Sequence, residues 1–317
     1  MLERLAARGL VRGERIGVDA SAMEANAALR AIRRREDGAS YPEMLTRMAQ
    51  ASGVPTPTAA ELKQRDRTRK GKRVRNAEWA SPSDARITRL RDGRTRLAYK
   101  SEHAVDLDTE AVPGSSPRMA AAIQPADRGD TTIAGTLQAA EAGLDAVGRA
   151  PTAAAPAELI ADKGYHGRAV LKDLDGSSWQ TRIAEPKPKD IQRWHGDLDA
   201  RRAVYGNRAR LRSGVGTEAF KLRAEKVERS FQHTLDRGSM RHTWLRGREN
   251  VPKRYLMHVA AYNLGLVMRA LLGAGTPKGA AARGAALLWL AEPTAGLVVL
   301  IVVPPDTPPE PTSSTAC

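Results

Sequence analysis

Short apolar runs of strand length, separated by helix-like segments, constrain the fold of this chain more than any other sequence feature. Ile16 and Val18 alternate with small residues in "RIGVDAS", which predicts a strand that ends near Asp19. Two further strands are expected in "ELIADKGY" and "TRIAEP". A hairpin is expected over Thr95–Val112, followed by a third strand that ends at Gln124. This order predicts an α/β fold on a mixed sheet of about five strands, part antiparallel and part parallel.

Helix-like patterns fill much of the remaining chain. Helices are expected from Glu24 onward, over Tyr41–Ala51, in "TTIAGTLQAAEAGLDAV" after an N-cap at Asp130-Thr131-Thr132, over Gly167–Gly176, over Thr217–Gly238 and over Lys253–Gly273. The last of these is apolar on nearly every side, which predicts a buried helix. A linker is expected over 150–157, and the sequence from Pro186 to Gly216 is polar and strand-poor. One domain is therefore expected over 1–275, with an irregular tail over 276–317.

The charge balance favours a polyanionic partner. The chain has 51 Lys and Arg against 36 Asp and Glu, a net charge of +15. Lys63–Arg75 alone carries eight basic residues and one acid without apolar periodicity, which predicts an exposed basic loop. Such an excess suits nucleic acid because each neutralised phosphate releases counterions. A genome rich in G and C also favours Arg, so charge alone leaves that alternative open.

Cysteine usage and apolar patterning indicate the cellular compartment. The only cysteine is Cys317, so the chain itself cannot form a disulfide or a cysteine zinc site, which fits a reducing cytoplasm. The N-terminus has no apolar core of signal-peptide length. Ala285–Val303 is long enough to span a bilayer, but Glu292 and Pro293 interrupt it. An irregular extension without membrane association is therefore expected.

Three acids fall where a metal site would form. Asp19 and Asp162 are expected at the ends of two strands, and Glu228 lies beside the apolar stripe of a helix, marked by Val227 and Phe231. Sites in α/β sheets gather at the carboxyl ends of strands. Converging carboxylates repel one another unless a cation lies between them, and hard oxygen ligands favour Mg²⁺ or Mn²⁺. Two such ions would support phosphodiester displacement. For any one of these acids, an ordinary surface charge is the alternative.

Other catalytic classes find no motif in the sequence. There is no GxSxG nucleophile elbow, no Walker A loop and no GxGxxG loop. The six histidines show no metal-binding spacing of the HExxH kind. Serine hydrolase, nucleotide-binding and zinc-peptidase functions are therefore not expected.

The segments "GVDASAMEANAALR", "SEHAVD", "ADKGYHG" and "VERSFQHTLDRGSMRHTWLRGRENVPKRYLMHVAAYNLGLVMR" together resemble the bacterial insertion-sequence transposases of the DDE (Asp-Asp-Glu) class. The resemblance runs from about residue 5 to 280. It implies a ribonuclease-H-like catalytic domain in which Asp19, Asp162 and Glu228 hold two Mg²⁺ or Mn²⁺ ions. It also implies cleavage of DNA strand ends by water and their joining to target DNA. The implied setting is the bacterial cytoplasm, with double-stranded DNA as partner and a homodimer or larger synaptic oligomer as the working form.

Further residues are expected to contact DNA. Lys163, Tyr165 and His166 follow Asp162 and would contact substrate or orient that carboxylate, although Tyr165 is equally expected to pack under the turn. Four more basic residues would contact phosphates, with surface solvation as the alternative for each. They are Lys100, Arg237, Arg241 and Arg246.

The chain also departs from the family pattern. Many relatives carry a Tyr, an Arg and a Lys around the glutamate, where this chain has Lys221, Ala224 and Leu235. Arg223 and Arg237 are the cations that could take over DNA contact. Asp19 comes after only eighteen residues, where family members have a helical DNA-binding region, so a copy truncated at its front is expected. Two alternatives follow: a DNA-binding remnant without catalysis, and a metal-dependent nuclease without strand transfer.

Overall fold

The computed structural model describes residues 1–70, 74–90, 92–113, 115–116, 119–120, 122–127, 133–187, 194, 196–282, 287–291 and 298–302. The chain divides into two compact units, Met1–Asn263 and Leu264–Cys317, and each is considered by itself. The expected N-cap at residues 130–132 lies outside the described residues.

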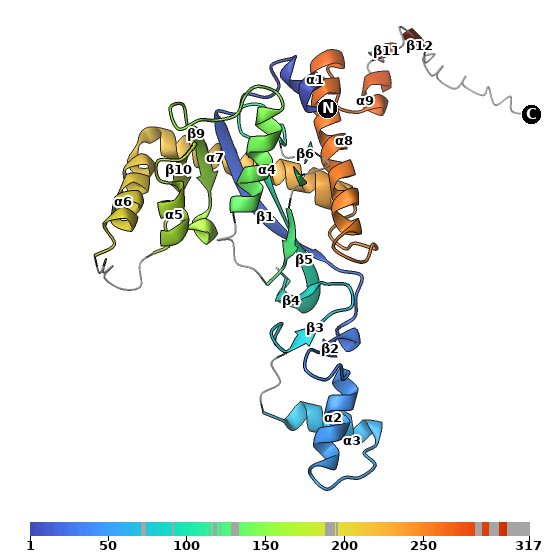
Figure 1. Cartoon of the computed structure of the whole chain (residues 1–317). Coiled ribbons are helices and arrows are strands. Elements are labelled where there is room, and N and C mark those ends of the chain that lie inside the picture. Colours follow the sequence, from blue (N-terminus) through green and yellow to red (C-terminus); the bar gives the residue numbers. More distant parts are fainter. Residues whose placement is uncertain are drawn as a thin grey trace, which may run out of the picture. The chain divides into compact units, whose positions relative to one another are not determined.

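One mixed sheet organises the first unit (Figure 1). Its strands are β1 (Arg15–Glu24), β4 (Arg86–Arg89), β5 (Thr95–Asp106), β8 (Ala122–Pro125), β9 (Ala157–Ala161) and β10 (Trp179–Ile183). They run in the order β10-β9-β1-β5-β4, and β8 pairs with β5 beyond the stretch that pairs with β4. β5 is antiparallel to β1, β4 and β8, whereas β1, β9 and β10 are mutually parallel. The predicted α/β fold with a mixed sheet of about five strands is confirmed.

Four helices cover the sheet. They are α4 (Ala134–Asp145), α5 (Arg168–Leu174), α6 (Leu198–Arg212) and α7 (Gly214–Phe231). α7 lies against β1, β5 and β9, while α5 and α6 lie against β10. Figure 1 shows α4 in front of the sheet and α7 partly hidden behind it. The centre of the core is β1, where Ile16 and Val18 are fully buried because covered strands on both sides exclude water.

Gly17 allows α7 to approach the middle of the sheet. An ideal Cβ at this position would lie 2.7 Å from Leu107 Cδ2, 3.0 Å from Val227 Cγ2 and 3.3 Å from Arg223 Cγ. Gly17 therefore faces α7. Because strand residues alternate between faces, Asp19 and Ser21 face the same helix. The absence of a side chain at Gly17 thus sets how closely the helix that carries Glu228 lies to the strand that carries Asp19.

We expect Gly17→Ala to destabilise the first unit by roughly 1–3 kcal/mol, because the added methyl group overpacks a filled core. The measurement is the free energy of unfolding in urea. Gly135→Ala is the matched control: Gly135 lies in α4, and an ideal Cβ there would have nothing within 4 Å, so it should be neutral or stabilising by up to about 1 kcal/mol. Equal stability of the two variants would contradict close packing at Gly17.

Most individual elements form where the sequence predicts them. The strands at Ile16, Gln124, Glu158 and Thr181 are present. So are the helices expected over Tyr41–Ala51, Gly167–Gly176, Thr217–Gly238 and Lys253–Gly273, within a few residues at their ends. One boundary matters for function. β1 does not end near Asp19 but continues to Glu24, so Asp19 lies in the middle of a strand.

Two element predictions are wrong, and one helix was not predicted. The chain after Glu24 is not a helix, because β1 runs up to Glu24 and a single 3-10 turn, η1 (Leu29–Ala31), follows. Thr95–Val112 is not a hairpin: β5 takes its partners from elsewhere and residues 107–112 form a turn. The polar, strand-poor region before Gly216 contains α6, a helix that apolar periodicity does not predict, because its burial rests on small residues and Asn207 rather than on a broad apolar stripe.

Residues 25–94 form an insertion between β1 and β5, and we call this segment the β1–β5 insertion. Besides η1 and β4 it contains β2 (Arg33–Arg34), α2 (Tyr41–Gln50), α3 (Ala59–Thr68) and β3 (Trp79–Ala80). The expectation of a basic loop over Lys63–Arg75 is wrong for its first half, because Lys63–Thr68 belongs to α3. The physical reason is a capping box, in which the Thr58 hydroxyl and the Glu61 carboxylate satisfy each other's backbone N–H groups and start the helix.

The helix α8 (Asn250–Leu272) begins in the first unit. Its predicted burial on nearly every side is wrong, since Met257 is 72% exposed while Val251, Tyr255 and Val259 are buried. One helix face suffices for packing, and the remaining apolar residues stay in solvent. Asn250–Gly279 is long and apolar enough to cross a membrane, a property that core helices of soluble proteins share.

The second unit contains the tail for which the sequence predicts an irregular structure. Its described residues include α9 (Pro277–Ala282) and two antiparallel strands, β11 (Leu287–Ala291) and β12 (Val298–Val302).

Candidate active site

A pocket of about 460 Å³ opens between β1 and the carboxyl-terminal half of α7. Asp19 and Glu228, two of the three acids singled out in the sequence, both contribute to its wall. They come from elements more than two hundred residues apart and meet because α7 crosses β1 at Gly17. The other lining residues are Ala20, Ser21, Arg223, Ala224, Phe231, Gln232, Asp236 and Arg241.

Asp162 leaves the sheet next to Asp19. The last paired positions of the parallel strands β1 and β9 are Val18 and Ala161, so Asp19 and Asp162 are the next residues along two neighbouring strands. Neighbouring strands lie about 4.8 Å apart. Asp162 is not among the residues that line the pocket, and its Oδ1 accepts a hydrogen bond from the Gly164 N–H at 2.9 Å. The carboxylate thereby caps the 3-10 turn η2 (Lys163–Tyr165).

Arg223 holds Asp19 from the helix side. Its Nη2 lies 3.0 Å from Asp19 Oδ2, and its Nε donates to the Val18 carbonyl at 3.1 Å. Asp19 Oδ1 accepts from the Ala20 N–H at 2.8 Å. The guanidinium is 11% exposed, so this is a largely desolvated contact rather than a solvated surface pair. In this structure a positive charge therefore already lies beside the first aspartate.

From the sequence, Arg223 was expected only to replace a missing DNA contact. Its spacing along α7 nevertheless indicates that its side chain faces the sheet. Arg223, Val227 and Phe231 recur at intervals of four and so share one face of α7. Val227 and Phe231 are buried against the sheet. A basic residue on that stripe has to point toward the sheet, and Asp19 is the acid that it meets there.

A π-helical turn forms the far wall of the pocket. α7 ends at Phe231 and continues as the π-helix η3 (Gln232–Arg237), a local geometry that is frequent at functional sites. Arg241 donates to both carboxylate oxygens of Asp236, at 2.7 and 3.1 Å, and to Ser21 Oγ at 2.9 Å. The hydrogen bonds from Arg241 hold the pKa of Asp236 below its usual value. Arg241 thus joins η3 to β1 across one side of the pocket.

A buried histidine supports the site from beneath. His103 on β5 is the register partner of Asp19, so the two side chains share a face of the sheet. Its Nε2 lies 2.8 Å from Ser230 Oγ and its Nδ1 lies 2.6 Å from the Tyr255 hydroxyl. The ring stacks on Phe231 with centroids 4.1 Å apart. Burial lowers the pKa of His103 to about 3. No sequence pattern indicates this network, because its members come from three distant elements.

The predicted DNA-contact residues around Asp162 differ in accessibility. Lys163 is exposed. Tyr165 is buried and packs under the turn, the structural alternative expected for it. His166 is half-buried, and burial lowers the pKa of its imidazole. Lys100 is only 6% exposed, with Nζ 5.9 Å from the centre of the Tyr165 ring. A lysine buried to this degree presents little surface for the phosphate contact predicted for it.

The remaining predicted contacts lie beyond α7. Arg237 and Arg246 are exposed, as a phosphate contact requires. Arg241 lines the pocket, but its guanidinium is engaged with Asp236 and Ser21. Of this set, only Arg241 is brought together with Asp19 and Glu228.

The donor chemistry fits a hard divalent cation, with one condition. Asp19 and Glu228 offer carboxylate oxygens to the same pocket, the ligand type that Mg²⁺ and Mn²⁺ prefer. The ion would replace the Arg223 guanidinium beside Asp19, so binding requires that ion pair to open. Among the described residues, no group of three or more His, Cys, Asp or Glu side chains lies close enough to hold one ion. The triad of Asp19, Asp162 and Glu228 thus stays a prediction.

No protein-family model, curated protein or solved structure matches this chain.

Proposed function

We propose that this chain is the catalytic domain of a DNA transposase of the DDE class, acting on double-stranded DNA with Mg²⁺ or Mn²⁺. The observation that carries the proposal is the convergence of Asp19 and Glu228 on one pocket, beside the strand end where Asp162 emerges. These are the three acids that the family resemblance assigns from sequence motifs alone. Asp19 and Glu228 lie far apart in the sequence, so the pocket that these two acids share supports the proposal independently of the motifs.

The fold is compatible with the finer expectation of a ribonuclease-H-like domain. Four strands paired antiparallel, β1, β4, β5 and β8, are followed by the parallel strands β9 and β10, each reached through a helix, with Asp19 on the central strand and Asp162 directly after its parallel neighbour. The net charge of +15 suits a duplex partner. By the same resemblance we place the protein in the bacterial cytoplasm and assign it a homodimeric or larger synaptic working form.

The residues of the pocket would divide the work as follows. Bound divalent metal would activate the attacking water and stabilise the leaving oxygen. Asp19, Asp162 and Glu228 would hold it, once Arg223 releases Asp19. Arg223 would then be free to bind a non-bridging phosphate oxygen, since a guanidinium pairs with phosphate through two hydrogen bonds. The Asp236–Arg241–Ser21 tie would keep the wall that faces the scissile phosphate rigid.

A second candidate function is DNA binding without catalysis. The Asp19–Arg223 ion pair favours it, because a guanidinium in the cation position competes with metal. The absence of the family's Tyr, Arg and Lys at positions 221, 224 and 235 points the same way.

Metal dependence of DNA nicking separates the two. We expect the full chain to convert supercoiled plasmid to nicked circles with Mg²⁺ or Mn²⁺, and to lose this activity completely with a chelator. Joining of a pre-cleaved oligonucleotide to plasmid would distinguish a transposase from a plain nuclease. Salt-sensitive DNA binding without nicking under either metal would establish the non-catalytic alternative.

A further inference from the structure

The β1–β5 insertion concentrates the positive charge of the chain. Residues 25–94 hold seventeen Lys and Arg against eight Asp and Glu, a net charge of +9 out of +15 for the whole chain. The other residues, more than three times as many, share the remaining +6. The charge is therefore a local property of one segment rather than a general feature of composition.

The insertion is a folded module with a small core of its own. Ile32, Leu45, Ala49 and Trp79 are buried, and the rings of Tyr41 and Trp79 lie 5.6 Å apart. Both helices begin with a capping box, at Ser40 in α2 and at Thr58 in α3. A module fixed in this way presents its cations at defined positions, unlike a disordered charged tail.

At least four of the eight acids of the insertion make contacts inside it. Glu43 and Glu61 complete the capping boxes, and backbone hydrogen bonds lower the pKa of each carboxyl group. Asp66 accepts from Tyr41 Oη at 2.8 Å and from Arg69 Nε at 2.9 Å. Asp37 pairs with Arg47. These carboxylates hold the module together and leave the surplus of positive charge on its surface.

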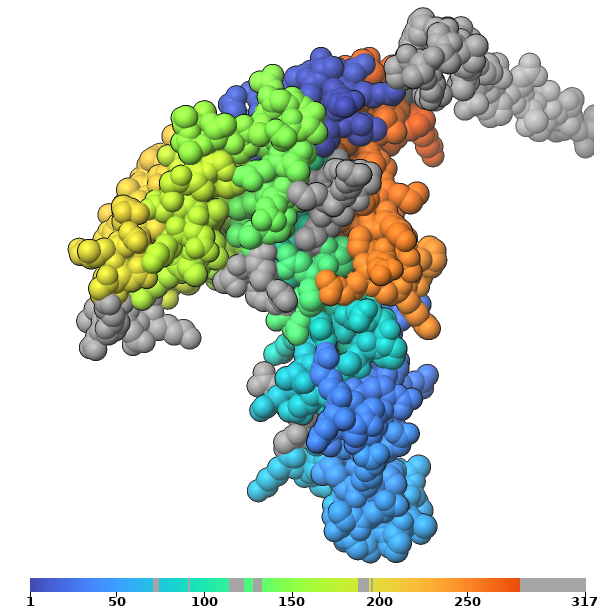
Figure 2. Space-filling model, viewed as in Figure 1, coloured from blue at the N-terminus to red at the C-terminus, as the bar shows by residue number. Residues whose placement is uncertain are grey.

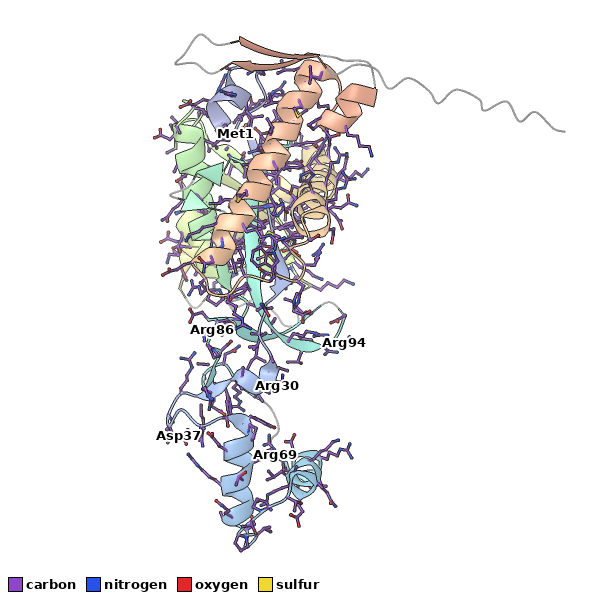
Figure 3. All side chains as sticks on the ribbon, turned by 90° about the vertical axis from the view of Figure 1, so that its right-hand side faces the viewer. Met1, Arg30, Asp37, Arg69, Arg86 and Arg94 are labelled. Atoms are coloured by element: carbon purple, nitrogen blue, oxygen red, sulfur yellow. The ribbon has the colours of Figure 1, made fainter. Side chains whose placement is uncertain are left out.

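Four exposed cations of the insertion make no ion pair and no side-chain hydrogen bond among the described residues. They are Arg30, Lys63, Lys70 and Arg75. Figure 3 labels Arg30 on the ribbon of the insertion; the other arginines labelled there, Arg69, Arg86 and Arg94, are in ion pairs. The surface of α2 and α3 is drawn in blue in Figure 2. An unpaired cation on a folded support can contact a phosphate without first breaking an ion pair.

The insertion starts from the strand of the candidate site. β1 carries Asp19 and enters the insertion after Glu24, five residues or about 17 Å further along the strand. Its root is held by Arg96, which donates to Glu24 at 2.7 Å, and by the Ala25 N–H, which donates to the Leu97 carbonyl at 2.9 Å. Because β1 and β9 are parallel, the insertion leaves the sheet at the same edge as the strand end where Asp162 emerges.

We propose that the β1–β5 insertion is a binding surface for the sugar-phosphate backbone of double-stranded DNA, through Arg30, Lys63, Lys70 and Arg75. This inference rests on the proposed function for its choice of duplex DNA. A membrane surface fits less well, because α3 has no buried residue and no broad apolar face to insert between lipids. The contacts bind any sequence, because they reach phosphates rather than base edges.

The test compares the salt dependence of duplex binding for two fourfold variants of the full chain. One variant carries Arg30→Gln, Lys63→Gln, Lys70→Gln and Arg75→Gln. The matched control replaces four exposed arginines elsewhere that make no ion pair among the described residues. These are Arg8, Arg12, Arg149 and Arg212. Equal melting temperatures of both variants and the wild-type chain would establish that folding is intact.

We expect the insertion variant to reduce the slope of log K against log salt by about 3 to 4, since each lost phosphate contact removes about 0.9. Its affinity should fall by roughly tenfold or more at about 0.1 M salt, while the control variant changes little. An unchanged slope, or an equal loss in both variants, would overturn the proposal. So would charge-dependent binding of anionic phosphatidylserine vesicles in place of DNA.

The rate of DNA nicking tests the proposed function, and the DNA affinity tests the insertion, so the two proposals can fail separately. With DNA concentrations that saturate the insertion variant, its metal-dependent nicking should approach the wild-type rate. A chain that never nicks but loses DNA affinity in the insertion variant would retain the binding surface and refute the enzyme. A chain that nicks DNA, and whose two variants bind DNA equally well, would support the enzyme and refute the binding surface.

Discussion

Asp19→Asn is expected to reduce metal-dependent DNA nicking by at least roughly 100-fold, a loss of about 2.7 kcal/mol in transition-state stabilisation. The amide keeps the size of the side chain but removes the charge that attracts a divalent cation. It also removes the partner of Arg223, whose Nη2 lies 3.0 Å from Asp19 Oδ2. Asp162→Asn and Glu228→Gln are expected to cause losses of similar size, because each would remove one ligand of the same site.

Two measurements distinguish lost ligation from lost folding. Mn²⁺ binding measured by calorimetry should weaken in these three variants, whereas their thermal unfolding should stay close to that of the wild-type chain. Glu225→Gln is the matched control for Glu228→Gln, since Glu225 lies three residues earlier on α7, is exposed and pairs with Arg229. Its nicking and Mn²⁺ affinity should be unchanged. Wild-type nicking by Asp19→Asn together with Glu228→Gln would show that these acids do not form the active site.

The fold was predictable where burial follows apolar periodicity. Short apolar runs around Ile16 and Leu159 predict strands, and the structure contains a strand at each, although β1 continues beyond its apolar run to Glu24. α6 escaped prediction because its packing depends on Ala203, Val204 and Asn207, two small apolar residues and an amide. Asn207 pairs with both backbone groups of Ile183, at 2.9 and 2.8 Å, and so replaces a neighbouring strand. Such a contact has no periodic signature in the sequence.

The helix α3 could have been predicted from its start rather than from its middle. The capping box of Thr58 and Glu61 is visible in the sequence. The basic residues that follow show no apolar stripe because the helix buries none of its side chains. Periodicity reports burial, so an exposed helix is invisible to it, whereas a cap remains readable.

Three acids could be picked out from the sequence, but the geometry around them could not. Family motifs singled out Asp19, Asp162 and Glu228, and the structure brings two of them into one pocket. The orientation of Asp162 depends on the Gly164 N–H, which engages its carboxylate within the η2 turn. The Asp19–Arg223 pair depends on how closely α7 approaches Gly17. The Asp19–Arg223 pair joins distant segments, and a local pattern cannot specify it, whereas the Asp162–Gly164 hydrogen bond spans two residues and belongs to the local turn.

The hydrogen bonds around His103 fix which ring nitrogen carries the proton. Ser230 has a single hydroxyl hydrogen, which it donates to the Val227 carbonyl at 2.7 Å. Ser230 Oγ can therefore only accept from His103, so Nε2 is the protonated nitrogen and Nδ1 accepts from Tyr255. A second proton on Nδ1 would face a hydroxyl donor inside a buried site. This arrangement agrees with a pKa of His103 lowered to about 3 by burial.

We expect His103 to make the folded state less stable as the pH falls below neutrality. Its pKa of about 3 in the folded chain is below the ordinary value of 6.5 that the unfolded chain regains, so between these values only the unfolded chain binds the proton. The resulting loss is about 1.4 kcal/mol between pH 7.5 and 5.5, and about 2.7 kcal/mol between pH 7.5 and 4.5. The stabilisation is fully present above about pH 6.5 and declines toward pH 3.

Urea unfolding of the wild-type chain and of His103→Gln across this range measures the effect. The variant should be less stable than the wild-type chain at pH 7.5, because Ser230 and Tyr255 lose their partner, and the difference should shrink as the pH falls. His242→Gln controls for the removal of a histidine as such, because His242 is exposed, and it should keep the wild-type pH dependence. A constant stability difference between the wild-type chain and His103→Gln from pH 7.5 to 4.5 would mean that His103 is protonated in the folded state as easily as in the unfolded one. The assignment of a neutral His103, hydrogen-bonded to Ser230 and Tyr255, would then be refuted.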